Sequence, residues 1–103
     1  MEKVLADLAP SMYFHGDYLS ISYAQCQERA NKAASLVLSR LDKPAEDAGM
    51  FALRGKTYST ISVIYCLERP GGSTFIVNTS SNYDSGESSS VNNRIAQIML
   101  GQL

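Results

Sequence analysis

The spacing of apolar and polar residues predicts two helices and four strands. The clearest pattern runs over residues 23–41, where apolar side chains recur every three to four positions and polar ones fill the remainder. Ser22 is the predicted N-cap and Pro44 the predicted stop. The predicted buried face consists of Cys26, Ala30, Ala33, Ala34, Val37, Leu38 and Leu41. Because three of these positions are alanine, we expect a close-packed partner, most simply a sheet.

Segments rich in β-branched and aromatic residues predict the strands, and clusters of small polar residues predict the connections. We expect strands at residues 11–21, 50–54, 57–68 and 74–79. Gly55-Lys56 and residues 69–73 are the predicted turns between the last three. Residues 43–49 and 80–90 are predicted loops, the second exposed and mobile. A final helix with an apolar face at Val91, Ile95, Ile98 and Met99 is predicted to begin at Ser89 or Ser90.

The order of elements predicts an α+β fold, β-α-β-β-β-α, in one domain over residues 1–103. We expect a two-layer sandwich in which a mostly antiparallel sheet has both helices on one face. The last three strands would form a meander. The first would join through the long helix, with a right-handed crossover if it runs parallel to its neighbour. Residues 1–10 are predicted to form a short N-terminal helix or an extension, ended by Pro10.

Two cysteines, Cys26 and Cys66, leave two arrangements open. A disulfide between them would stabilise the fold by roughly 3–4 kcal/mol, whereas two free thiols would act as small buried hydrophobes. The predicted strand at residues 57–68 is apolar on both faces. If the bond forms, the helices cover the Cys66 face. Ile61, Val63, Tyr65 and Leu67 then point outward as a candidate interface.

Composition and charge exclude several classes of protein. Nine Lys plus Arg against ten Asp plus Glu give a formal net charge of -1, which offers no basic footprint for nucleic acid. Apolar residues make up 45% of the chain, too many for a disordered one. No apolar run approaches the ~20 residues of a membrane span. No secretory signal is visible, so we expect a cytoplasmic protein as written, or a periplasmic or secreted one if a signal has been removed.

No catalytic, cofactor or metal motif stands out, and we predict a protein that is not an enzyme, binds no metal and needs no cofactor. His15, the single histidine, lies near Asp17 and Tyr23. A small-molecule pocket or minor active site there is the alternative hypothesis. The tyrosines are the better candidates, because tyrosine at a sheet face is a frequent binding anchor. The candidate binding residues are Tyr13, Tyr18, Ile61, Val63 and Tyr65.

The helix segment Cys26-Gln27-Glu28-Arg29-Ala30-Asn31-Lys32-Ala33, followed by the strand segment Ile64-Tyr65-Cys66, resembles small uncharacterised bacterial α+β proteins, many of them exported. The resemblance spans roughly residues 13–100 and implies no activity; it favours export and a disulfide. We therefore predict a small protein-binding or self-associating module, of the kind found among bacterial or phage accessory and inhibitor proteins, with a protein partner or a second copy. A purely structural accessory domain is the remaining alternative.

Overall fold

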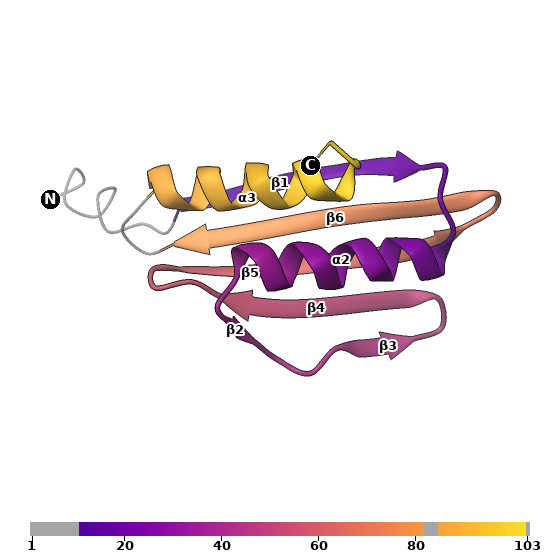
Figure 1. The fold of residues 1–103 in the computed structure, drawn as a ribbon, viewed down its shortest axis with the longest axis horizontal. Coiled ribbons are helices and arrows are strands. Elements are labelled where there is room, and N and C mark those ends of the chain that lie inside the picture. The colour runs from indigo at the N-terminus through magenta and orange to yellow at the C-terminus, as the bar shows by residue number, and fades with distance from the viewer. Residues whose placement is uncertain (1–10, 82–84, 103) are drawn as a thin grey trace, which may run out of the picture.

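The computed structural model describes residues 11–81 and 85–102 (Figure 1). The predicted N-terminal helix therefore lies outside the described residues. The elements are β1 (Ser11–Leu19), α2 (Tyr23–Val37), β2 (Arg40–Leu41), β3 (Ala45–Asp47), β4 (Met50–Lys56), β5 (Thr60–Arg69), β6 (Gly72–Ser81) and α3 (Ser85–Met99).

One antiparallel sheet contains all six strands, in the order β1-β6-β5-β4-β2, with β3 pairing beside β2 on the outer edge of β4. The β4-β5-β6 meander is the one predicted. β1 pairs along its whole length with β6, from Ser11 opposite Ser81 to Leu19 opposite Ser73. This neighbour is antiparallel, so the right-handed parallel crossover that the sequence left open does not arise.

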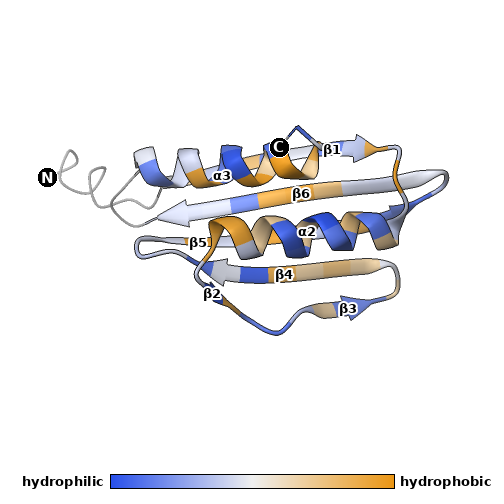
Figure 2. Ribbon diagram, in the orientation of Figure 1, coloured by the Kyte–Doolittle hydropathy of each residue, from blue (hydrophilic) through white to orange (hydrophobic). Residues whose placement is uncertain are grey.

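Both helices lie on the same face of the sheet, which confirms the two-layer α+β sandwich (Figure 1). α2 packs on β4, β5 and β6, while α3 packs on β1, β5 and β6 and against α2. Ala30, Ala33 and Ala34 are fully buried, as their spacing predicted. Polar and apolar residues alternate along both helices in Figure 2, the pattern of helices with one buried side. Ser22 caps α2, accepting from the Gln25 backbone N–H while the Gln25 side chain accepts from that of Ser22.

A disulfide between Cys26 and Cys66 joins α2 to the central strand β5. Its Cα atoms are 6.0 Å apart, and both residues are fully buried. The bond settles the alternative that the sequence left open. The face of β5 that carries Ile64 and Cys66 is buried beneath the helices, so Ile61 and the residues in phase with it point to the opposite side.

Polar side chains occupy part of the interface between the sheet and α3. Asn92 is 2% exposed, and its Nδ2 donates to the carbonyls of Tyr13 and Val77 and to the hydroxyl of Thr79. The Thr79 hydroxyl lies 2.8 Å from that of Ser62 in a further hydrogen bond. These bonds satisfy groups that would be costly to bury alone, and they tie α3 to β1, β5 and β6.

Several predicted boundaries at the β4 edge were wrong. α2 ends at Val37 rather than residue 41 because Leu38 has extended backbone (φ -107°, ψ 150°) and the Ser39 N–H donates to the Lys56 carbonyl. The chain then enters β2 and, within the predicted loop 43–49, β3. Gly55-Lys56 is not a turn: β4 runs through both residues. A Cβ at Gly55 would lie 2.7–2.8 Å from the ends of the Leu41 and Leu38 side chains and 3.0 Å from the Arg40 carbonyl oxygen, so these neighbours would have to shift.

The predicted exposed loop over residues 80–90 was wrong in its second half, because α3 already begins at Ser85. Ser88 is fully buried on α3, one turn before the buried residues Val91 and Asn92. The helical period is therefore present in this segment, but serine occupies an inward position. Tyr58, which falls in the predicted strand over residues 57–68, lies instead in the connection between β4 and β5 and is 95% exposed.

Candidate binding face

The sheet face turned away from α2 and α3 is the candidate functional site, and we call it the open face. In each of four strands, every second residue points to the open face, and the residues between them point toward the helices. The pairing register sorts these residues into columns, one per strand. The open face consists of Met12, Phe14, Gly16 and Tyr18 on β1; Ser80, Asn78, Ile76 and Thr74 on β6; Ile61, Val63, Tyr65 and Leu67 on β5; and Lys56, Arg54, Ala52 and Met50 on β4.

The same register aligns these residues into rows across the strands. One row consists of Phe14, Asn78, Val63 and Arg54, and the next of Gly16, Ile76, Tyr65 and Ala52. The outer rows are Met12, Ser80, Ile61 and Lys56 at one end and Tyr18, Thr74, Leu67 and Met50 at the other. Apolar residues predominate on β1 and β5. The row of Gly16, Ile76, Tyr65 and Ala52 joins these strands across β6, whose other residues on this face are the polar Ser80, Asn78 and Thr74.

The open face exposes large apolar side chains to water. Phe14 is 63% exposed, Tyr18 52% and Ile61 43%. With about 200 Å² per aromatic side chain, Phe14 and Tyr18 alone leave roughly 200–250 Å² in water. Adding the apolar residues of β5 and β6 brings the patch to several hundred Å², the size at which an exposed apolar patch marks an interaction site.

Charged residues flank the open face along the outer edge of β4. At one end stand Arg54 and Lys56 of β4, with Arg40 of β2 opposite Lys56. At the other end Asp47 of β3 is opposite Met50. Arg54 pairs with Asp42. Within residues 11–81 and 85–102, neither Arg40 nor Asp47 forms an ion pair, so both ends of this edge offer an uncompensated charge.

The structure brings together four of the five predicted binding residues: Tyr18, Ile61, Val63 and Tyr65 share the open face. Tyr13 does not join them. It lies opposite Thr79 on the helix-covered side of β1, and its carbonyl accepts from Asn92. Phe14, Ile76 and Met12 belong to the open face and were missed. The signal for Phe14 was its even spacing from Tyr18, since residues two or four apart share a strand face.

The structure does not assemble the alternative site around His15, Asp17 and Tyr23. His15 is exposed on the helix-covered side of β1, its ring stacked 6.3 Å from that of Phe75. The Asp17 carboxylate accepts from the neighbouring Tyr18 N–H. Burial, and after it the nearby Glu46 carboxylate, raise the pKa of the Tyr23 phenol above its usual 10.0. Among the described residues, no group of three or more His, Cys, Asp or Glu would be able to hold a metal ion.

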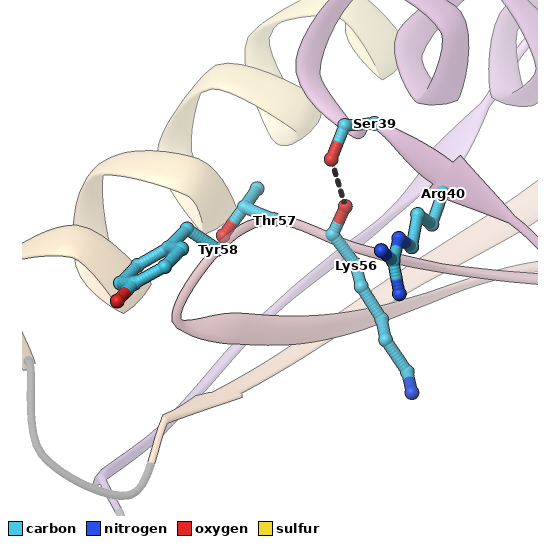
Figure 3. Close-up of a pocket in the computed structure, with 5 residues that line it drawn as sticks. All are labelled: Ser39, Arg40, Lys56, Thr57 and Tyr58. Atoms are coloured by element: carbon cyan, nitrogen blue, oxygen red, sulfur yellow. Dashed lines mark hydrogen bonds between the residues drawn. The ribbon is translucent and has the colours of Figure 1, made fainter.

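Two hollows are found on the surface of the described residues. The larger, about 430 Å³, is lined by Ser39, Arg40, Lys56, Thr57 and Tyr58 at the end of β4 (Figure 3). The Ser39 hydroxyl donates to the Lys56 carbonyl there, while the side chains of Arg40 and Lys56 extend together to one side, away from Tyr58. The second, about 250 Å³, lies along α2 and is lined by Ile21, Gln25, Glu28, Arg29 and Lys32. Neither hollow includes His15 or Tyr23.

Comparisons with known proteins identify no family. No protein-family model matches the chain, and no curated protein matches its sequence. Among solved structures, the crystal structure of Ara h 8.0201 is similar, with 9% identity and a TM-score of 0.45 over 90% of this chain and 99% of that one. None of the described helices is both long and apolar enough to cross a membrane.

Proposed function

We propose that this chain is a non-enzymatic module that binds protein through the open face. The observation that carries the proposal is the apolar surface of β1 and β5, joined across β6 by Ile76 and lying opposite the two helices. A sheet in a monomer normally buries one face and exposes polar residues on the other. Here the second face carries Phe14, Tyr18 and Ile61, all exposed, which costs free energy unless a partner covers them.

The chemistry of this surface suits binding rather than catalysis. The open face holds aromatic and aliphatic side chains, which supply contact area, and a few neutral polar groups such as Thr74 and Asn78. Its charged residues, Arg54 and Lys56, lie on its outermost strand, β4. Tyrosine and phenylalanine are common anchors in protein interfaces because they bury large areas with few rotatable bonds. The charged residues stand at the rim, where a protein interface normally carries its polar groups. A protein of complementary shape fits this pattern.

Site-specific photo-crosslinking in cells that express the gene tests the proposal. The photoreactive residue benzoylphenylalanine replaces Phe14 on the open face or, as the control, Leu36 on α2. The two positions are matched, since Phe14 is 63% and Leu36 61% exposed, and both are apolar. We expect a protein adduct of one defined mass from position 14 and none of that mass from position 36.

A second substitution, Val63→Asp, gives the decisive comparison because it places a charge in the middle of the open face without touching the buried side. The adduct from position 14 should disappear in this background, while circular dichroism shows an unchanged fold. Equal adducts from positions 14 and 36, or an adduct that persists in Val63→Asp, would contradict a binding role for the open face. The same holds if position 14 yields no adduct.

A further inference from the structure

We infer that the partner is a second copy of this chain, docked open face to open face about a two-fold axis that lies between the sheets and runs perpendicular to the strands. This inference rests on the proposed binding role of the open face. Two sheets that pack face to face keep their strands within about 30° of parallel or antiparallel and lie about 10 Å apart. The arrangement is isologous, so every contact occurs twice.

The axis direction fixes which residues meet. Rotation about a line perpendicular to the strands places each strand over its own copy and reverses it. The two middle rows of the open face therefore exchange places: the row of Phe14 and Val63 lies over the second copy's row of Gly16 and Tyr65. The two outer rows exchange in the same way.

Side-chain size is complementary in this arrangement. On β1, the protruding Phe14 lies over the second copy's Gly16, which has no side chain and leaves room for the ring. On β4, the long Arg54 lies over the second copy's Ala52. On β5, Tyr65 lies over Val63. In the middle rows of these three strands, a larger residue of one copy thus faces a smaller one of the other, as interdigitated sheet interfaces require. In the outer rows large side chains meet, with Met12 over Tyr18 and Ile61 over Leu67.

The rim charges are complementary as well. Arg40 and Asp47 belong to the two short strands that pair side by side with β4, one near each end of it. Reversal of the strands brings Arg40 of one copy over Asp47 of the other, and the symmetry repeats the pair. Both residues lack an ion-pair partner among the described residues of one chain. Rotation about an axis parallel to the strands would instead bring β4 over β1 and leave both charges without a partner.

The available surface matches a modest dimer. Four strands spaced about 4.8 Å apart, with four rows about 6.8 Å apart, cover roughly 500 Å² in projection. With the relief of the side chains and the β2–β3 edge this approaches about 600–700 Å² per copy, at the lower end of stable interfaces, which bury about 1,200–2,000 Å² in total. We therefore expect a reversible dimer whose population depends on protein concentration.

Charge reversal at the rim tests the arrangement, with sedimentation of the full chain between about 1 μM and 1 mM as the readout. Wild type should shift from its 11.2 kDa monomer toward twice that mass. Arg40→Glu alone sets two carboxylates against each other, and Asp47→Arg alone sets two guanidinium groups against each other. The two-fold axis creates the Arg40–Asp47 pair twice, so each substitution disrupts two pairs at once. Each variant should therefore raise the dimer dissociation constant about tenfold.

An equimolar mixture of the two variants should restore association, because one chain then supplies two acids and the other two bases. A mixture as weak as either variant alone would overturn the inference, as would a wild type that stays monomeric throughout. A third outcome is that wild type dimerises and Val63→Asp abolishes the dimer, but the charge variants change nothing. In that case the proposed axis is wrong, while the binding role of the open face stands. If wild type is monomeric but Phe14 crosslinks to another protein, the second copy is refuted and the proposed function survives.

Discussion

Reduction of the Cys26–Cys66 bond should destabilise the fold by an amount that follows from the length of the loop it closes. The two cysteines are 40 residues apart, and a crosslink over a loop of that size removes denatured-state entropy worth about 4 kcal/mol. Both cysteines are fully buried, so the reduced thiols stay between α2 and β5, where the two sulfur atoms have to move apart from covalent to van der Waals distance. The expected loss is therefore at least that of the crosslink, a large share of the stability of a domain of this size.

Urea unfolding with and without reductant measures this loss. At an m-value of about 1–1.5 kcal/mol/M, the midpoint should fall by about 3 M, and the melting temperature by roughly 15–30 °C. The matched control is the double variant Cys26→Ala/Cys66→Ala, which should resemble the reduced protein apart from the lost sulfur packing and should ignore reductant. If alkylation shows both thiols free after reduction and stability changes by less than about 1 kcal/mol, the chain-entropy reasoning is refuted.

Three further predictions concern single side chains. Asn92→Ala should lower the free energy of unfolding by about 1–3 kcal/mol, because three acceptors lose their hydrogen-bond donor. The control, Asn93→Ala at an exposed position, should be nearly neutral. Identical chemical denaturation curves for the two variants would contradict this prediction. Gly72→Ala should cost about 1–3 kcal/mol in the same assay, since the new Cβ would overlap the Leu19 carbonyl oxygen; a neutral result would show that β1 moves freely. For Tyr23, a folded-state pKa above the unfolded value gives stability that is present below pH 10.0 and lost as pH rises through the folded pKa. The unfolding free energy of wild type should therefore fall more steeply with pH than that of Tyr23→Phe above pH 10.0. Parallel curves of unfolding free energy against pH for the two proteins would contradict the raised pKa.

The start of α2 was predictable and its end was not. Ser22 and Gln25 form a local capping box that needs no distant residue. At the other end, Leu38 continues the apolar period and is buried, but in extended conformation, because the chain there already bonds to Lys56 of β4. A tertiary hydrogen bond decided this boundary, and no local pattern reports it.

The open face was predictable only in part for a similar reason. Both faces of β5 carry apolar side chains, so its sequence does not say which face lies beneath the helices. The disulfide through Cys66 supplies that information. The sequence put Ile61, Val63 and Tyr65 on the outward face only on condition that this bond forms, and the bond in the structure meets that condition. β1 is also aromatic in both phases and has no such marker. Tyr13 was chosen over Phe14 because it is a tyrosine, although Phe14, and not Tyr13, has even spacing from Tyr18. The register with β6 places Phe14 on the open face.

The pairing of β1 with β6 sets the order in which the chain can fold as it is made. β1 leaves the ribosome before any other strand of the sheet, yet its partner β6 is the last strand to be synthesised. The meander can form from neighbouring segments, whereas β1 has to wait for a contact across most of the chain, and such long-range closure slows folding. During that interval an aromatic-rich strand with Tyr13, Phe14 and Tyr18 stands unpaired, which exposes it to aggregation. We therefore expect nascent chains truncated before residue 72 to be held by chaperones, and chains that extend beyond β6 to be released once β6 closes the sheet.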